Sequence, residues 1–167
     1  IPQGETSGKG KPINRIIGIT EDEAVCSVIR VREFEAEKFI MLFSRKGFVK
    51  KMQLESFSRT RATGIIVAKV PEDDTLFEAR ITAGDSEVIL GTNLGKAIKF
   101  NETDVRPIGR NARGVMGIRL SDSDFLVGAD IVDEENNTIL TVTENGIGKK
   151  SDLDLYRLQT RGGKGII

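Results

Sequence analysis

Several residue types are scarce in this chain of 167 residues, and each scarcity removes a class of function. The sequence has no histidine and no tryptophan, and Cys26 is its single cysteine. Without histidine the commonest general base is missing, and the usual zinc and iron–sulfur sites have too few ligands. A lone cysteine forms no internal disulfide, which indicates a reducing compartment. No apolar run approaches the ~20 residues that span a bilayer, so we expect no membrane partner.

What the chain does contain is typical of a folded domain. Charged residues make up 30% and hydrophobic residues 38% of it, which favours a soluble globular protein over a disordered one. The sequence starts at Ile1 rather than at methionine, and we expect it to be a fragment of a longer chain.

The sequence repeats itself about every fifty residues, in the stretches 39–70, 87–120 and 138–167. Each stretch opens with an apolar run, turns at a glycine, continues through basic residues and ends at a second glycine followed by apolar residues. The turn glycines are Gly47, Gly95 and Gly146. The second glycines, Gly64, Gly114 and Gly165, stand 50 and 51 residues apart, and Gly10 lies 54 residues before the first of them. A regular period of this length is typical of repeat architectures.

Each repeat predicts β-structure. The triplets RKG, NLG and ENG fit tight hairpin turns, and their flanks are rich in Val, Ile, Thr and Phe. Residues 24–34 alternate in part and predict a further strand. We therefore expect an all-β, propeller-like fold with four-stranded blades of about fifty residues, forming part of a larger disc. Within this single unit, residues 1–19 end one blade, and about 20–70, 71–120 and 121–167 are successive repeats.

Charge alternates in phase with the repeat, although the net charge is zero. Residues 45–69 hold seven cations and one anion, 94–119 six and two, and 146–167 five and two. The connector 70–93 has a net charge of −5 and the connector 120–145 one of −7. Because stacked repeats bring equivalent segments to the same side, we expect a continuous basic band that binds a polyanion.

The register of the repeat selects the candidate phosphate contacts. Four residues after each turn glycine stand Lys51, Lys99 and Lys150, the row that we favour, with Lys50 and Lys149 one residue earlier. Lys and Arg beside a rigid strand suit phosphates, which contribute affinity without reading sequence. The other candidates lie in the turns and in the loops before the second glycines: Arg59, Arg61, Lys96, Arg106, Arg110, Arg113, Arg157, Arg161 and Lys164.

Catalytic alternatives are weaker. The stretch 91–97, GTNLGKA, resembles a nucleotide-binding loop but is one residue short, lacks the Ser/Thr that meets magnesium, and falls in a predicted hairpin. GETSGKG at 4–10 fails the same test. Tyr156, the only tyrosine, stands in register with Phe57 and Val105 and is interpreted as a packing residue. We interpret the acidic positions as solvated turns: Asp73, Asp74, Asp122, Asp124 and residues 133–135. We therefore expect no catalytic residue and no metal site.

The loop QTRGGKG near the C-terminus has two interpretations. It consists of Gln159, Thr160, Arg161, Gly162, Gly163, Lys164 and Gly165, and it has two more glycines than its counterparts RTRATG and RNARG. The glycines suit a bulged turn. They also allow backbone N–H groups to approach a phosphate, with Arg161 and Lys164 beside it.

Three phrases carry a resemblance to a known family. The G-x-x-K-K turn, VRPIGRNARGVMGIRL (105–120) and TVTENGIGKK (141–150) closely resemble the C-terminal domain of the bacterial DNA gyrase A subunit, over essentially the whole chain. The resemblance implies a six-bladed β-pinwheel with strands exchanged between blades. It also implies that duplex DNA bends around a basic rim to support ATP-dependent negative supercoiling.

The resemblance further implies the context of the chain. It implies no cofactor in this fragment, with ATP and magnesium used elsewhere in the parent enzyme, a type II topoisomerase. The implied partners are double-stranded DNA, the rest of the gyrase A subunit and the gyrase B subunit, in the bacterial cytoplasm on the chromosome. The family's box motif reads Gln-Arg-Arg-Gly-Gly-Lys-Gly, and residues 159–165 match it except at Thr160. Since the principal box belongs to the first blade, we interpret this one as a box-like copy on a later blade.

Two alternatives remain open from the sequence. The C-terminal domain of the topoisomerase IV A subunit shares the architecture but lacks a full box. A protein-interaction propeller would instead use the acidic connectors to bind a basic partner.

Overall fold

The computed structural model describes residues 7–20, 22–61, 63–132 and 137–167. Within these ranges the chain forms strands and short turns of 3-10 helix, and none of its helices is long and apolar enough to cross a membrane. The strands are β1 (Phe39–Ser44), β2 (Phe48–Gln53), β3 (Leu76–Thr82), β4 (Glu87–Thr92), β5 (Ala97–Asn101), β6 (Val115–Met116), β7 (Leu126–Val132), β8 (Thr138–Val142), β9 (Gly148–Asp152) and β10 (Leu158–Gln159). The helical turns are η1 (Ile13–Arg15), η2 (Leu54–Phe57), η3 (Glu102–Asp104) and η4 (Leu153–Leu155).

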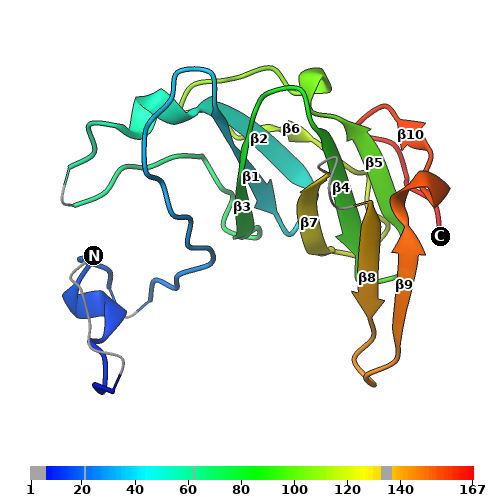
Figure 1. Cartoon of the computed structure of the whole chain (residues 1–167), viewed down its shortest axis with the longest axis horizontal. Coiled ribbons are helices and arrows are strands. Elements are labelled where there is room, and N and C mark those ends of the chain that lie inside the picture. Colours follow the sequence, from blue (N-terminus) through cyan, green and yellow to red (C-terminus); the bar gives the residue numbers. More distant parts are fainter. Residues whose placement is uncertain (1–6, 21, 62, 133–136) are drawn as a thin grey trace.

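Two four-stranded blades are built by exchange between repeats. The first sheet has the order β3-β1-β2-β6, and the second, read in the same direction, is β7-β4-β5-β10. Each hairpin is thus flanked by an outer strand that follows it and by a short strand from the next repeat. Figure 1 shows the blades side by side in an arc, with η2, η3 and η4 in succession along its convex edge. The all-β, propeller-like prediction is confirmed.

The hairpins form where the sequence places a glycine that permits positive φ. Gly47, Gly95 and Gly146 have φ values of 84°, 80° and 78°, in the region that tight turns require and that side chains disfavour. Strand pairing on either side is antiparallel and in register, as in Met41 opposite Lys51 and Ile89 opposite Lys99. The stretch 91–97 is confirmed as part of such a hairpin.

Two buried carboxylates hold the outer strands to these turns. Asp74 accepts hydrogen bonds from the Ser44 hydroxyl at 2.8 Å and from the Lys46 N–H at 2.9 Å. Asp124 accepts one from the Leu94 N–H at 3.1 Å in the next blade. The interpretation of these two as solvated is therefore wrong, since each caps a turn from a buried position. Asp73 and Asp122 are exposed, and residues 133–135 fall in a stretch outside the described residues.

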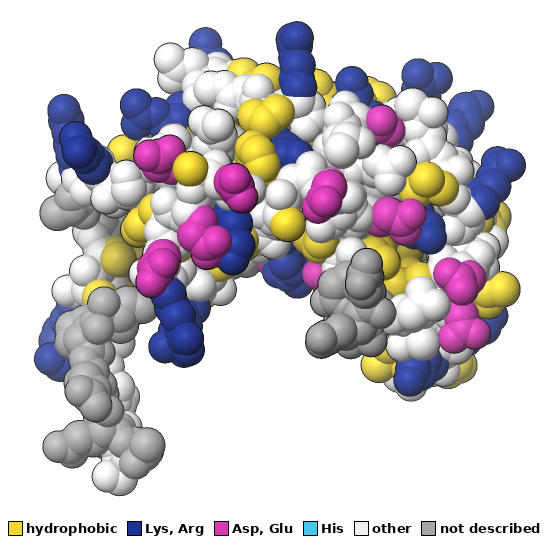
Figure 2. Space-filling view, turned by 45° about the horizontal axis from the view of Figure 1, so that its top comes forward, with side chains coloured by type: hydrophobic (Ala, Val, Ile, Leu, Met, Phe, Trp, Pro, Cys, Tyr) yellow, Lys and Arg dark blue, Asp and Glu magenta, His cyan; other side chains and the backbone are white. Residues whose placement is uncertain are grey.

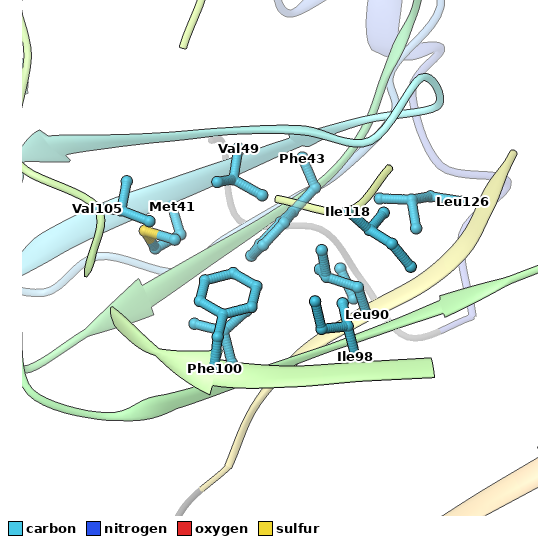
Figure 3. Close-up of a cluster of buried hydrophobic side chains, with 11 residues drawn as sticks. Met41, Phe43, Val49, Leu90, Ile98, Phe100, Val105, Ile118 and Leu126 are labelled. Atoms are coloured by element: carbon cyan, nitrogen blue, oxygen red, sulfur yellow. The ribbon is translucent and has the colours of Figure 1, made fainter. Parts of the chain in front are cut away.

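The main hydrophobic core lies between the two complete blades. Met41 and Phe43 of β1 face Leu90 and Phe100 of the second blade, and all four side chains are almost completely buried (Figure 3). A smaller cluster covers the other face of the first blade, where Ile29 packs near Leu42, Met52 and Ala79. Alternate residues of one strand therefore serve two cores, as the strand period requires.

The prediction of a strand at 24–34 is wrong, although Ile29 contributes to packing. In the complete blades the outer strands β3 and β7 pair with β1 and β4, which begin 37 and 39 residues earlier. Within the described residues, no strand pairs with 24–34, so the backbone of this stretch joins no ladder.

The second glycines mark the points where one repeat meets the preceding hairpin. A Cβ on Gly114, at φ 112°, would lie 2.6 Å from the Val49 carbonyl oxygen, and one on Gly165, at φ 72°, would lie 2.7 Å from the Ala97 oxygen. Real Cβ atoms do not approach so closely. Gly64 has φ 77° but nothing within 4 Å of its Cβ position. These three equivalent glycines thus differ in one respect, the presence of a neighbouring strand.

The contrast gives a matched pair of substitutions. We expect Gly64→Ala to lower the free energy of unfolding by about 1 kcal/mol, the cost of positive φ alone. Gly114→Ala is expected to cost about 3 kcal/mol or more, because the new methyl group also collides with the Val49 backbone. Urea denaturation of both variants measures the difference. Equal losses would contradict the assignment of Gly114 to the blade junction.

Candidate nucleic-acid interface

The candidate site consists of three rim loops, one per repeat, which we define as residues 57–61 with 63–64, residues 105–114 and residues 156–165. Rim loop 2 is fixed to the first blade at both ends, because Pro107 pairs with Lys51 and β6 pairs with β2. Rim loop 3 is fixed to the second blade in the same manner, by β10 on β5 and by hydrogen bonds of 2.7 and 2.8 Å between Ala97 and Ile166. Rim loops 2 and 3 therefore project from anchored backbones.

The rim loops carry the exposed cations. All of their Lys and Arg side chains except that of Arg161 are exposed, and Figure 2 shows Lys and Arg side chains along the upper, outer edge, with most Asp and Glu side chains in view on the face beneath. The exposed candidates in these loops are Arg59, Arg61, Arg106, Arg110, Arg113, Arg157 and Lys164. Arg113 is also held in place, because its guanidinium lies 3.8 Å from the centroid of the Phe48 ring.

A groove of about 300 Å³ opens at the rim between the first two repeats. Its walls come from the η2 region, including Gln53 and Ser56, and from Pro107 to Arg110 of rim loop 2. The groove is a shallow surface rather than an enclosed pocket, and its lining combines the apolar Met52, Pro107 and Ile108 with the polar Gln53, Ser56 and Arg110. Such a surface fits an extended polyanion better than a small molecule.

Two of the three lysines in the favoured row, Lys51 and Lys99, are buried, and so is Lys50. Lys50, Lys51 and Lys99 are 2%, 3% and 8% exposed, so the prediction that they face a ligand is wrong for these three. Strand alternation distinguishes two faces of a sheet, but in a stacked fold both faces are covered. Lys149 and Lys150 on β9 are exposed, and Lys96 is half-buried.

Lys51 instead makes an internal ion pair across the blades. Its Nζ lies 2.9 Å from Oε1 of Glu102, a residue with no exposed surface, and it donates to the Gly84 carbonyl at 2.9 Å. The Phe39 ring centroid lies 4.3 Å from the same ammonium. Glu102 also accepts hydrogen bonds from the Thr82 hydroxyl and the Ser86 N–H. The pair therefore ties β2 to η3 of the next repeat.

Lys99 occupies the equivalent place in the second blade. Its Nζ lies 3.0 Å from Oε2 of Glu87. Glu87 occupies the position in the repeat that Phe39 occupies in the first blade. At this position Lys51 contacts an aromatic ring, whereas Lys99 pairs with a carboxylate. Tyr156 is half-buried at the position where Val105 is fully buried, and the packing interpretation of both positions agrees with this placement.

The box-like loop, residues 159–165, turns most of its polar groups toward the protein. Arg161 donates to the carbonyls of Asp104 at 2.8 Å and Met116 at 3.2 Å. The Gly162 N–H donates to the Gly117 carbonyl at 2.6 Å, so that amide is not available to a phosphate. Thr160 and Lys164 are exposed, and Gln159 is half-buried. Of its two cations, Lys164 is the one that solvent reaches fully.

A second row of cations was missed by the sequence interpretation. Arg15, Lys69 and Arg119 each stand five residues after a second glycine, and all three are exposed. The Arg119 N–H donates to the Gly163 carbonyl at 2.8 Å, which places it beside rim loop 3. Counting from the second glycine rather than from the turn glycine would have found this row.

Metal chemistry finds no support at the site. Over the ranges given above, no group of three or more His, Cys, Asp or Glu side chains is placed to hold a metal ion.

Comparison with known proteins gives one consistent family. The family model described as "DNA gyrase C-terminal domain, beta-propeller" matches residues 38–83, 86–133 and 137–167. The DNA gyrase A subunit of Haloquadratum walsbyi is 38% identical over 100% of this chain, and that of Staphylococcus epidermidis is 40% identical over 99%. The chain spans about a fifth of the length of these relatives, 20% and 19%.

Solved structures agree on the architecture. A DNA topoisomerase IV C-terminal domain superposes with a TM-score of 0.88 at 29% identity, covering 95% of this chain and 49% of that one. A DNA gyrase A C-terminal domain gives 0.85 at 28% identity, covering 95% and 52%. These two are equally similar, so the family model and the curated relatives, not the superpositions, distinguish the two enzymes.

The role of Lys51 in a buried ion pair can be tested by comparing its substitution with that of an exposed lysine. Lys51→Met leaves the Glu102 carboxylate buried without its cation, and we expect the free energy of unfolding to fall by about 3–5 kcal/mol. Lys46→Met removes an exposed lysine whose partner, Asp73, is also exposed. Its effect should be much smaller, because water screens that pair. Urea denaturation compares the two, and similar losses would contradict the buried-pair assignment.

Proposed function

Because this chain belongs to the DNA gyrase C-terminal domain family, we propose that it binds duplex DNA along its rim loops and bends it around the convex edge of the arc. The observation that carries the proposal is the exposure of cations on equivalent loops of three successive repeats, two of which are anchored to the preceding blade. A row of such loops presents charges at intervals along a curved edge, which suits a backbone of regularly spaced phosphates.

The proposed contacts differ from those predicted by the sequence. They comprise the exposed rim-loop arginines and Lys164, together with Lys69 and Arg119, and they leave out the buried Lys50, Lys51 and Lys99. Lys149 and Lys150 on β9 stay in the proposal as exposed cations. Since contacts to phosphates carry no sequence information, binding is expected to show little sequence preference.

Bending requires several contacts at once. Curving a duplex of about 20–30 base pairs by 40–90° costs roughly 1–6 kcal/mol, so one loop alone does not hold a bend. We propose that wrapping supports ATP-dependent negative supercoiling by a parent type II topoisomerase. DNA cleavage and ATP hydrolysis would then belong to the rest of the gyrase A subunit and to the gyrase B subunit, acting on the bacterial chromosome in the cytoplasm.

Loss of one rim cation tests the contact surface. We expect Arg113→Ala to weaken binding to unrelated duplex sequences alike and to make the log–log salt slope less steep by about 0.9, the value for one phosphate contact. Arg80→Gln is the matched control, because Arg80 lies on β3 and pairs with Glu78 and Asp130. Fluorescence anisotropy titrations at several salt concentrations give both slopes. A flat salt response of the unmutated chain would overturn the proposal.

Wrapping is tested separately from binding. If DNA follows the curved rim, affinity should rise strongly with duplex length, since a short duplex reaches only one loop. Relaxation of a closed circular plasmid by a nicking-closing enzyme in the presence of the chain should also shift the linking-number distribution. Equal affinity for long and short duplexes with no such shift would indicate straight binding, and no binding to either would favour a protein-interaction role.

A further inference from the structure

Lys50 is a buried cation whose partners are backbone carbonyls. It is 2% exposed, and its Nζ donates to the carbonyl oxygens of Val67 at 2.7 Å, Arg110 at 2.8 Å and Ala112 at 2.7 Å. An ammonium group has three protons, so three acceptors use all of them. Burial lowers the pKa of this ammonium.

The three carbonyls belong to two different repeats. Val67 follows rim loop 1, whereas Arg110 and Ala112 lie within rim loop 2, immediately before Arg113. Lys50 itself lies on β2, the strand to which both ends of rim loop 2 are fixed. One side chain therefore reaches from the hairpin into the centre of the loop, where strand pairing does not extend, and joins it to the segment after rim loop 1.

The next junction along the arc is built differently. Ile98 stands where Lys50 stands in the first blade, and Gly163 stands where Ala112 does. A Cβ on Gly163 would lie 3.3 Å from Cδ1 of Ile98, so the loop packs closely onto an apolar side chain. The hydrogen bonds to carbonyls of the preceding repeat come from Arg161 of the loop itself. At both junctions a cation thus joins the rim loop to another repeat through backbone carbonyls, and it is supplied by the hairpin in one case and by the loop in the other.

We propose that Lys50 is a positioning residue for DNA binding, which holds rim loop 2 so that Arg110 and Arg113 meet the duplex together. The proposal rests on the DNA-binding function proposed above. A loop that is ordered before binding loses less conformational entropy when it binds, so its phosphate contacts form at lower cost. Without the three hydrogen bonds, the middle of rim loop 2 keeps the bond from the Lys69 N–H to the Ala112 carbonyl, at 3.4 Å, and the contact of Arg113 with Phe48, and it is held less firmly between its two anchors.

The test compares two buried lysines in the 167-residue chain. Lys50→Met removes the bonds to rim loop 2, whereas Lys99→Met removes a buried lysine whose ammonium pairs with Glu87. Both variants lose one positive charge and both are expected to be less stable. At a temperature where both are folded, we expect Lys50→Met to make the salt slope for duplex binding less steep by up to about 1.8, the value for two phosphates. Lys99→Met should leave the slope unchanged.

A double-mutant cycle shows whether Lys50 acts through the two arginines. Lys50→Met is combined with Arg110→Ala and Arg113→Ala, and the salt slopes are compared. If Lys50 positions them, its substitution adds almost nothing once they are absent. Should Lys50→Met not fold, Lys50→Gln, which keeps two N–H donors, is the second variant, with a smaller loss of slope expected.

The possible failures are distinguishable. A flat salt response of the unmutated chain overturns the proposed function, and the role of Lys50 with it. A steep response that Lys50→Met leaves unchanged overturns the role of Lys50 alone. Full additivity with the arginine substitutions does the same, since it shows that Lys50 does not act through Arg110 and Arg113.

Discussion

The structure depends on one close approach, in which the backbone of each repeat lies against the hairpin of the repeat before it. At Gly114 and Gly165 the approach is so close that no side chain fits between the glycine and the carbonyl oxygens of Val49 and Ala97. The contact at Gly114 adjoins β6, which completes the first sheet, and the contact at Gly165 adjoins the bridge between Ala97 and Ile166, so both fix the C-terminal ends of their rim loops. Fold and candidate interface therefore share the same anchors, and the loops have little freedom to move as whole units.

Positive charge has two separate uses in this chain. Lys50, Lys51, Lys99 and Arg161 bind carbonyls or carboxylates inside the protein, where they join strands or repeats. Burying a charge is costly, and the hydrogen bonds and ion pairs of these groups offset part of that cost. The remaining rim cations lie in solvent. Although its net charge is zero, the protein has paired charges in its interior and positive charges along its outer edge.

Much of the fold was accessible from the sequence, because its signals are local. The turn glycines, the fifty-residue period and the alternation of charge predicted the hairpins, the blades and the side on which exposed cations gather. The burial of Lys51 could not be predicted from the sequence, because its partner Glu102 lies in the next repeat and strand alternation does not show which faces of a sheet are covered. Asp74 and Asp124 were misread for the same reason. The strand expected at 24–34 failed because a strand needs a partner, and local pattern does not reveal whether one is present.

Strand exchange between repeats also constrains how such a chain can change in length during evolution. Since β6 and β10 complete sheets that began in the preceding repeat, removal of one hairpin alone leaves a donated strand without an acceptor. Removal or duplication of one whole repeat of about fifty residues, starting at any residue, leaves each donated strand one repeat after the hairpin that accepts it. The number of blades is therefore free to vary only in steps of a full period, and the position of the cut within the period is of little consequence.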